Sequence, residues 1–265
     1  SDSCEMLPFH AKGDKEYDKT APFTIERVSY RRYPFLKPES LIIFIASLWK
    51  AFWMTKKHKI ELVHCDKVLP AGLVAFYLHK LTKIPYMVYC HGEEVSTYLQ
   101  YTGVVKKMAD VYNSAAKIIV NSTFTRNLLI GIGVRPDNLV VIHPGVDTNI
   151  FRPGIESGWI RDKYNLKDKR VLLTVGRLQR RKGHDMVIRA MPELAKAFPD
   201  LMYMIVSDGE EMEYLKGLAK ELGVEDKVIF AGRVRQEDIP AYFNLCDIFI
   251  MANRTMEGGD VEGFG

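Results

Sequence analysis

The sequence lacks the patterns that mark several common kinds of active site. Its four cysteines, Cys4, Cys65, Cys90 and Cys246, form no Cys-x-x-Cys pair, so a zinc site built from thiolates is not expected. No Gly-x-x-x-x-Gly-Lys-Ser/Thr run and no Gly-x-Ser-x-Gly run occurs, which argues against a P-loop nucleotide hydrolase and a serine hydrolase. An Asp-x-Asp pair near a strand end is also missing, and we predict that the protein binds no metal ion.

The chain also carries no strong excess of charge of either sign. It contains 37 lysines and arginines against 33 aspartates and glutamates, which gives a net charge of +4. A protein that binds nucleic acid usually shows a concentrated basic face, so no nucleic-acid partner is expected. Apolar residues make up 47% and charged residues 26% of the 265 positions, which is typical of a globular protein with room for two domains.

Long apolar runs are scarce, and the longest extends from Leu41 to Met54. Lys50 interrupts it, and a transmembrane helix needs about 20 apolar residues, so the run is too short to cross a bilayer. Because apolar residues surround the expected helix, we favour a buried core helix. A second interpretation, a helix that lies on an anionic membrane surface, stays open because the flanks are basic at Lys37, Lys56, Lys57 and Lys59.

The N-terminal residues and the cysteines indicate a cytoplasmic protein. Residues 1–18 are polar and charged, so they do not resemble a signal peptide. Scattered cysteines in or beside apolar segments are typical of reduced thiols in the core of a cytosolic protein. We therefore expect a cytoplasmic protein, with peripheral contact to the inner face of the membrane if the run at 41–54 is a surface helix.

Short apolar runs alternate with helical patterns from residue 60 onward. Near-continuous apolar runs indicate strands that are buried on both faces, and hence parallel sheets covered by helices. The first series of strands is expected at residues 61–66, 86–91, 117–121 and 139–143. Its helices are expected at 70–81, at 104–114, and from Ser122 or Thr123 onward, where either side chain can cap a helix.

A segment rich in turn residues, from His143 to Gly154, separates a second series. A helix at 156–164 leads into strands at 170–175, 201–206, 227–230 and 247–251, with helices at 184–198, 210–222 and 238–245 between them. The pattern predicts an α/β fold with two Rossmann-like domains, at residues 1–150 and 151–265. Both domains look incomplete, because no buried strand opens the first and no helix follows the last strand of the second.

One basic segment, Gly176 to Gly183, has the pattern of an anion site. Arg177 follows the strand at 170–175, and Lys182 precedes the helix that is expected from residue 184. Free N–H groups at a helix N-terminus favour anions, while the fork of an arginine and the ammonium of a lysine suit a diphosphate. The alternative interpretation is a loop with ordinary solvated cations.

Other strand ends carry candidate ligand-binding residues, because ligands of open parallel sheets bind beyond the carboxyl ends of the strands. His91 ends the strand at 86–91, and Asp208-Gly209 and Gly232-Arg233 end two neighbouring strands. Turn chemistry alone also explains these residues, as a structural histidine and two tight turns. The carboxylates Glu93-Glu94 are expected to begin a helix.

In chain order, these segments resemble landmarks of the family 4 retaining glycosyltransferases of the GT-B fold. The run Gly176-Arg-Leu-x-x-x-Lys-Gly183 resembles the segment with which that family grips the donor diphosphate. The resemblance covers about residues 60–265 and points to the actinobacterial phosphatidylinositol-mannoside mannosyltransferases and related bacterial enzymes. The other matching segments are His91-Gly-Glu-Glu94, Pro144-Gly-Val-Asp147 with Phe151 and Pro153, Val206-Ser-Asp-Gly209, Val228-Ile-Phe-Ala-Gly-Arg233, and Arg254 to Gly265.

The resemblance implies roles for individual residues. Arg177 and Lys182 would bind the donor diphosphate, His91 would contact the donor sugar or its phosphate, and Glu262 would bind hydroxyls of that sugar; these four are the implied catalytic residues. The second glutamate of the family's Glu-x7-Glu motif and the glycine-rich loop after its first strand have no counterpart here, so a fragment without full activity is expected. The other implied donor-binding residues are Gly176, Gly183, Asp208, Gly209, Gly232, Arg233, Gly263, Phe264 and Gly265.

The sequence therefore predicts a retaining, metal-independent hexosyltransferase that moves a sugar from a nucleoside-diphosphate sugar to an acceptor hydroxyl of a lipid or glycan. GDP-mannose is the first expectation for the donor, UDP-sugars come next, and no cofactor is expected. Two other functions stay open. One is a nucleotide-sugar 2-epimerase, which shares the GT-B architecture, and the other is a truncated, non-catalytic protein that binds a nucleotide sugar.

Overall fold

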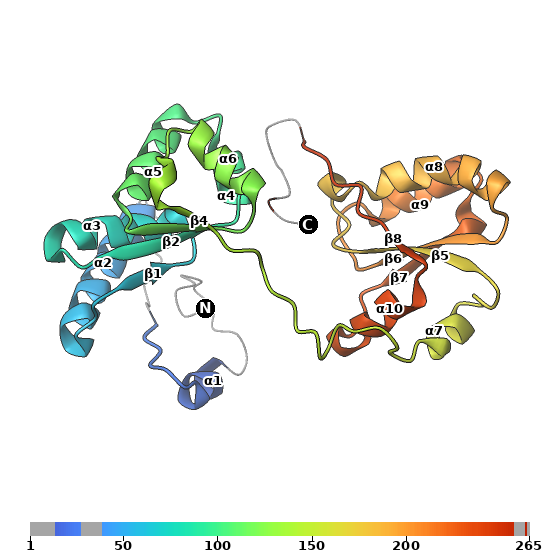
Figure 1. The fold of residues 1–265 in the computed structure, drawn as a ribbon, viewed down its shortest axis with the longest axis horizontal. Helices are drawn as coiled ribbons and strands as arrows, with labels where there is room; N and C mark the ends of the chain where they lie inside the picture. The colour runs from blue at the N-terminus through green and yellow to red at the C-terminus, as the bar shows by residue number, and fades with distance from the viewer. Residues whose placement is uncertain (1–13, 28–38, 257–262, 264–265) are drawn as a thin grey trace. The chain divides into compact units, whose positions relative to one another are not determined.

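The chain forms two compact units, Ser1–His143 and Pro144–Gly263, called unit 1 and unit 2 (Figure 1). The computed structural model describes residues 14–27, 39–256 and 263. The boundary between the units lies at the start of the turn-rich segment that follows the first series of strands. Each unit has its own parallel sheet and its own hydrophobic core.

Unit 1 contains a parallel sheet of four strands in the order β1-β2-β3-β4. Val88 and Ile118 pair in register in the middle of this sheet and are fully buried. Because the strands run in one direction, all their carboxyl ends meet at one edge. The strands lie where the apolar runs predicted them, as β1 (Val63–Cys65), β2 (Tyr86–Cys90), β3 (Lys117–Val120) and β4 (Leu139–Val141).

The helices predicted in unit 1 are present in the predicted order, and a short helix at Asp14–Thr20 was not predicted. The helix expected at 70–81 begins only at Leu73, because Leu69, before Pro70, has an extended backbone (φ −125°, ψ 134°) and Val68–Gly72 forms a separate helical turn. Ser122 caps its helix as predicted, since its Oγ accepts from Thr125 N over 3.1 Å. The helices are α1 (Asp14–Thr20), α2 (Glu39–His58), α3 (Leu73–Thr82), α4 (Glu93–Tyr98), α5 (Thr102–Ser114) and α6 (Thr123–Gly131), with a short turn at Pro136–Asn138.

Two cysteines lie in the core of unit 1. Cys65 and Cys90 end the two neighbouring strands β1 and β2; both are buried and neither forms a disulfide, as the sequence predicts. Burial raises the pKa of the Cys90 thiol, so it stays protonated at neutral pH. Cys246 in unit 2 is free and half-buried, and Cys4 lies outside the described residues. The described thiols therefore behave as packing residues of the two cores.

Unit 2 contains a second parallel sheet, in the order β7-β6-β5-β8. The central strands β5 (Arg170–Val175) and β6 (Leu201–Val206) have the predicted bounds and pair along their whole length. β7 (Val228–Gly232) extends further than predicted. β8 (Ile248–Phe249) is shorter than the predicted 247–251, because this edge strand pairs only through its two residues with β5.

Helices cover both faces of the unit 2 sheet (Figure 1). Leu172 packs toward α8 and α9, whereas its neighbour Leu173 packs toward α7 and α10. Strands that are buried on both faces explain the near-continuous apolar runs of the sequence. The helices are α7 (Gly158–Lys163), α8 (His184–Ala197), α9 (Met212–Glu221) and α10 (Ile239–Leu245), with short turns at Arg180–Lys182, Glu225–Lys227 and Gln236–Asp238.

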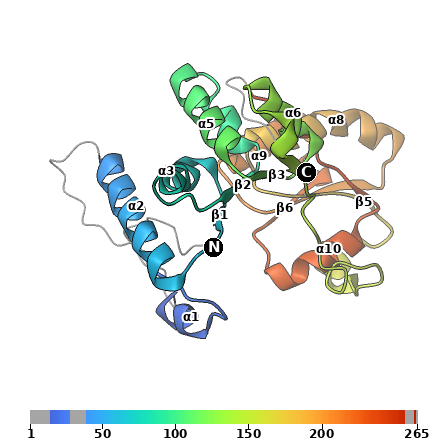
Figure 2. The same cartoon turned by 60° about the vertical axis from the view of Figure 1, so that its left-hand side comes forward.

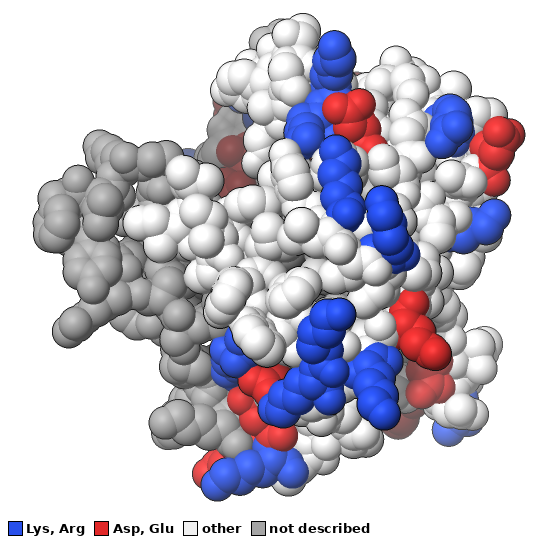
Figure 3. All heavy atoms as spheres, turned by 90° about the vertical axis from the view of Figure 1, so that its left-hand side faces the viewer, with Lys and Arg blue, Asp and Glu red and all other residues white. Residues whose placement is uncertain are grey.

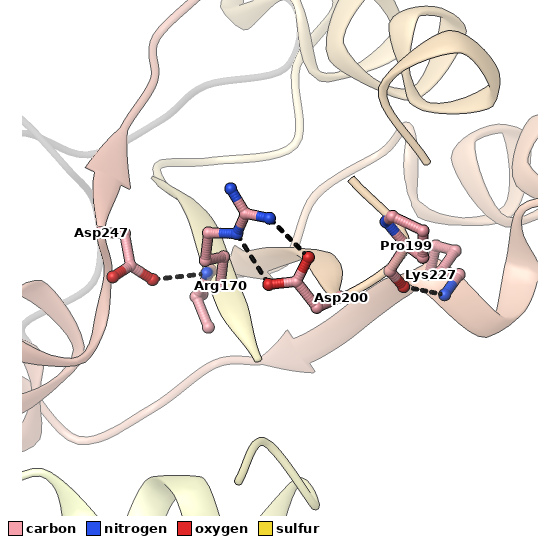
Figure 4. A network of polar contacts seen from close by, with 6 residues as sticks. Arg170, Pro199, Asp200, Lys227 and Asp247 are labelled. Atoms are coloured by element: carbon pink, nitrogen blue, oxygen red, sulfur yellow. Dashed lines mark hydrogen bonds and ion pairs between the residues drawn. The ribbon is translucent and has the colours of Figure 1, made fainter. Parts of the chain in front are cut away.

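Polar contacts join the amino ends of the unit 2 strands (Figure 4). Arg170 Nε and Nη2 donate to Asp200 Oδ2 and Oδ1 over 2.7 and 2.6 Å. Asp247 Oδ2 accepts from the backbone N–H that follows Arg170 over 2.7 Å, and Lys227 Nζ donates to the carbonyl of Pro199 over 2.8 Å. Hydrogen bonds from the Arg170 guanidinium lower the pKa of Asp200 to about 2. These contacts tie the four strands together at the edge opposite their carboxyl ends.

α2 is buried on one side only and is not the core helix that is favoured from the sequence. It packs along α3 at the outer side of unit 1, away from the strands (Figure 2). Because only one side of the helix meets α3, apolar residues on the other side stay exposed. Among the described residues, no helix combines the length and the apolar character of a membrane-spanning segment. The exposed apolar side chains recur at helical spacing and form one stripe of Leu41, Ile42, Ile45, Trp49 and Trp53, each 38–64% exposed.

Candidate functional site

The loop after β5 lies at the carboxyl edge of the unit 2 sheet. Gly176 N donates to Val206 O over 3.0 Å, and Leu178 N donates to Asp208 O over 2.9 Å. Leu178 is fully buried, while the side chain of Arg177 is exposed. The loop is thus held against the end of β6, with the Arg177 guanidinium on the outside.

Gly183 connects this loop to α8. It follows the helical turn Arg180–Lys182 and has a left-handed backbone, with φ 72°. A Cβ at this position would lie 1.9 Å from the carbonyl oxygen of Ala252, so only glycine allows the two segments to come this close. No side chain caps the start of α8, and its first N–H groups follow Lys182 directly in the chain. The predicted arginine, lysine and helix start are therefore present on one loop.

His184, the first residue of α8, is buried beneath this loop with 2% of its surface exposed. Its Nε2–H donates to the carbonyl oxygen of Arg177 over 3.2 Å. Burial lowers the pKa of His184, so the ring is neutral at pH 7. No role for His184 is predicted from the sequence; its position directly after the glycine that ends the loop is the signal that could have found it.

The turn after β6 lies beside the same loop, and the turn after β7 lies beside the turn after β6. A Cβ on Gly209 would lie 2.5 Å from the carbonyl oxygen of Leu178, so this turn is packed against the loop. Arg233 Nη2 lies 3.3 Å from Asp208 Oδ1, and their side chains are 81% and 52% exposed. Gly232 has φ 70°, and its carbonyl accepts from the backbone N–H that precedes Asp208 over 3.0 Å. The structure thus brings together the four residues that the sequence singled out at these turns.

Two charged residues without a role in the sequence interpretation also lie at this edge. Arg254 follows β8, and its backbone N–H donates to the carbonyl oxygen of Arg181 over 2.9 Å. Its Nη2 lies 3.0 Å from Oδ2 of Asp185, the second residue of α8. The expectation that strand ends carry ligand-binding residues, applied to β8 as well, would have selected Arg254.

In unit 1, His91 follows β2 at the carboxyl edge of the sheet, as predicted. Its Nε2 lies 3.3 Å from Asp66 Oδ1, which follows β1, and its side chain is 45% exposed. His91 N donates to Glu94 Oε1 over 3.0 Å, and Asn121 Nδ2 donates to His91 O over 3.0 Å. α4 begins at Glu93, so the predicted helix start is confirmed. Asp66 and Asn121 were not singled out, although they follow the two strands that flank β2.

The remaining candidates from the sequence lie near the C-terminal end. Glu262, Phe264 and Gly265 are outside the described residues, whereas Gly263 is described and buried. In the described part of the chain, no group of three or more His, Cys, Asp or Glu side chains is arranged to hold a metal ion. The described candidates therefore form two separate groups. One group is the loops after β5 to β8 in unit 2, and the other is the residues around His91 in unit 1.

Both units match known protein families. Residues 9–150 match the family described as Glycosyltransferase Family 4, and residues 158–265 match the family described as Glycosyl transferases group 1. The chain belongs to glycosyltransferase family 4. The family resemblance drawn from the sequence is thereby confirmed.

Curated relatives of this family 4 glycosyltransferase include a GDP-mannose-dependent alpha-(1-6)-phosphatidylinositol monomannoside mannosyltransferase from Mycolicibacterium smegmatis. It is 32% identical over 256 residues, which cover 96% of this chain and 65% of the relative. A D-inositol 3-phosphate glycosyltransferase from Acidothermus cellulolyticus is 31% identical over 250 residues, which cover 86% of this chain and 53% of that protein. The chain thus spans 53–65% of the length of these relatives.

Solved structures of glycosyltransferases resemble the family 4 chain in fold. Anabaena HepE in complex with UDP-glucose has a TM-score of 0.70 at 21% identity, covering 92% of this chain and 65% of that one. Sucrose-phosphate synthase from Thermosynechococcus elongatus has a TM-score of 0.69 at 21% identity, covering 91% and 61%. With the two parallel sheets, these similarities confirm the predicted GT-B fold.

Proposed function

We propose that the intact protein is a retaining hexosyltransferase that moves a sugar from a nucleoside-diphosphate sugar to an acceptor hydroxyl. The observation that carries the proposal is the loop Gly176–Gly183, which places Arg177 and Lys182 between the end of β5 and the uncapped start of α8. Membership of family 4 supports this interpretation of the loop. Similarity to a GDP-mannose-dependent relative favours GDP-mannose as the donor. The UDP-glucose complex of HepE makes UDP-sugars the second candidates.

The basic loop suits the bond that must break in this reaction. The bond between the anomeric carbon and the diphosphate oxygen breaks, a bond to the acceptor oxygen forms, and the acceptor proton leaves with the released diphosphate. Negative charge grows on the diphosphate as its bond breaks. Arg177, Lys182 and the first N–H groups of α8 would stabilise that charge more in the transition state than in the bound donor.

The other strand ends supply the remaining roles in the proposal. Asp208-Gly209 and Gly232-Arg233 would bind the base and ribose of the nucleotide. His91 would contact the donor sugar, with Asp66 holding the orientation of its imidazole ring. The segment Glu262 to Gly265 would bind hydroxyls of the donor sugar, a role that rests on the family resemblance.

A panel of nucleotide sugars tests this proposal on the complete protein. Thermal unfolding is followed with GDP-mannose, UDP-glucose and an ADP-sugar, since a ligand at 100 times its Kd stabilises by about 2.7 kcal/mol. The best donor is then incubated with and without a candidate lipid acceptor, and release of nucleoside diphosphate is measured. Acceptor-dependent release is expected. A free epimerised nucleotide sugar, or binding without any release, would instead support an epimerase or a non-catalytic binder.

We also propose that α2 touches an anionic lipid surface, which would bring the protein to a lipid acceptor. Its apolar stripe includes Trp49 and Trp53, whose rings lie 5.7 Å apart, and tryptophan is favoured at membrane interfaces. Basic side chains of lysine and arginine, with some acidic ones, lie around uncharged surface on this side of the molecule (Figure 3). The basic residues at the C-terminal end of α2, all exposed, are Lys56, Lys57, His58 and Lys59. Apolar and basic groups together fit an anionic bilayer.

A further inference from the structure

The segment after β8 lies directly against the basic loop of unit 2. The carbonyl oxygen of Ala252 occupies the space that a side chain on Gly183 would need. Arg254 N donates to Arg181 O over 2.9 Å, next to Lys182 in the chain. The position of the loop therefore depends on a segment that is distant in sequence.

A charged pair strengthens this contact. Arg254 Nη2 lies 3.0 Å from Asp185 Oδ2, and the two side chains are 30% and 9% exposed. Solvent screens a pair at this depth less than a pair on the surface. Asp185 is the second residue of α8, where the helix dipole also stabilises a carboxylate.

The same carboxylate is unfavourable for an anionic ligand. An unpaired Asp185 at the start of α8 would repel a diphosphate bound by Arg177 and Lys182. The Arg254 guanidinium offsets this charge, and its backbone N–H fixes the loop at Arg181. One residue thus acts on both the charge and the geometry of the loop.

We propose that Arg254 and Asp185 are positioning residues for donor binding. Together they form a brace that holds the Arg177–Lys182 loop and the start of α8 in the arrangement that receives the diphosphate. The inference rests on the proposed function, because it assumes that this loop binds a nucleoside diphosphate. It adds a specific requirement, which is that affinity for the diphosphate depends on an ion pair that does not itself contact the ligand.

The brace predicts that substitutions of Arg254 and of Asp185 have different effects on the affinity for a nucleoside diphosphate. Arg254→Ala leaves the Asp185 carboxylate unpaired beside the anion site, so affinity for a nucleoside diphosphate falls. Asp185→Asn removes the repelling charge and leaves a cation at the same place, so affinity falls less or rises. The double variant Asp185→Asn/Arg254→Gln removes both charges and recovers part of the affinity that Arg254→Ala loses. If the ion pair only stabilised the fold, the three variants would not differ in affinity in this order.

Calorimetric titration of the complete protein with GDP and with UDP tests the brace. Arg254→Ala is expected to weaken binding about tenfold, which corresponds to about 1.4 kcal/mol, and Arg254→Lys to retain most of the affinity. In turnover assays the KM for the donor rises more than kcat falls. Arg170→Ala is the matched control, because Arg170 also pairs with an aspartate in unit 2 but lies at the opposite edge of the sheet (Figure 4).

The outcomes separate the brace from the function on which it rests. Unchanged GDP or UDP affinity in a folded Arg254→Ala variant overturns the brace and leaves the proposed function intact. Weaker binding in Arg170→Ala to the same degree also overturns it, since the effect is then one of general stability. If Arg254→Ala does not fold, the GDP and UDP affinities of Asp185→Asn and of the double variant are compared instead. Higher affinity in Asp185→Asn, which keeps the Arg254 cation, supports the brace, and equal affinities overturn it. No binding of GDP or UDP by the unaltered protein contradicts the proposed function itself.

Discussion

Gly183 shows how backbone packing constrains a single residue of the candidate site. The sequence predicts an anion-binding loop that ends at this glycine, since the loop lies between a strand and a helix. It does not predict why a glycine is required, because the contact with Ala252 joins segments that are far apart in the chain. Local pattern thus identifies the loop, while tertiary contact fixes one of its residues.

We expect Gly183→Ala to lower the free energy of unfolding and to weaken nucleotide binding. The left-handed backbone alone costs a non-glycine residue about 1–3 kcal/mol, and the Cβ also meets the Ala252 carbonyl. Gly217→Ala in α9 is the matched control, because a Cβ there has nothing within 4 Å. That change is expected to stabilise by about 0.5–1 kcal/mol. Urea unfolding of both variants checks this, and equal stability would contradict the packing described at Gly183.

The buried His184 predicts a loss of stability in mild acid. Its pKa is lowered in the folded protein, so the unfolded chain takes up the proton first as pH falls below about 6.5. The stabilising contribution is complete above that pH and is lost below it. The melting temperature should therefore fall between pH 7.5 and pH 5.5, and fall less in His184→Gln. An equal fall in both proteins would show that His184 is not responsible.

The His91 edge shows what strand-end reasoning finds and what it misses. His91 was singled out because it ends a buried strand. Asp66 and Asn121 also follow buried strands, yet their contacts with His91 appear only when the order β1-β2-β3 is known. The sequence gives the strands but not which of them are neighbours.

At the scale of elements, α2 is the case in which periodicity could not decide burial. Apolar residues on several sides favoured a core helix, but burial depends on how many neighbours a helix has. Only α3 makes substantial contact with it among the described elements, through contacts such as Phe44 on Tyr77 with ring centroids 5.5 Å apart. The stripe around Trp49 therefore stays exposed.

The proposed lipid contact predicts binding of the complete protein to anionic vesicles. Trp49→Ser/Trp53→Ser should lower co-sedimentation with phosphatidylglycerol vesicles several-fold, because tryptophan rings at the interface are lost. Trp159→Ser in unit 2, which is 39% exposed, is the control. Phosphatidylcholine vesicles should bind less, and added salt should weaken binding. Unchanged sedimentation of the double variant would contradict the lipid contact, and concentration-dependent self-association through α2 would assign the stripe to a second copy instead.

The polar network at the amino ends of the unit 2 strands predicts a second, more acidic transition. The pKa of Asp200 falls from its ordinary value of 3.8 to about 2 because Arg170 donates to it. A lowered carboxyl pKa contributes stability above the ordinary value and loses it as pH falls toward the folded value. Asp200→Asn should therefore be less stable at pH 5 but lose less stability between pH 4 and pH 2. The free energy of unfolding of both proteins is measured by urea unfolding at several pH values. An equal loss in both proteins between pH 4 and pH 2 would contradict this prediction.

At the scale of the whole molecule, the alternation of apolar runs and helical patterns sufficed to predict two α/β units with parallel sheets. The strands of both sheets lie where they were predicted, because strands buried on both faces leave a clear pattern in sequence. Strand order and register did not follow from the sequence, since pairing is decided by contacts between distant segments. Glu262, Phe264 and Gly265 remain predictions that rest on family resemblance.

The central claim is that Arg177 and Lys182 stabilise the departing diphosphate. The most direct measurement is the rate of acceptor-dependent release of nucleoside diphosphate by the complete protein, compared among Arg177→Ala, Lys182→Ala and Arg189→Ala. Arg189 is an exposed arginine on α8 that contacts Tyr214 and serves as the control. Loss of one charge-stabilising donor is expected to lower the rate by about 10²–10³, with the control unchanged. Near-normal rates in Arg177→Ala and Lys182→Ala would contradict the assignment of this loop to the diphosphate.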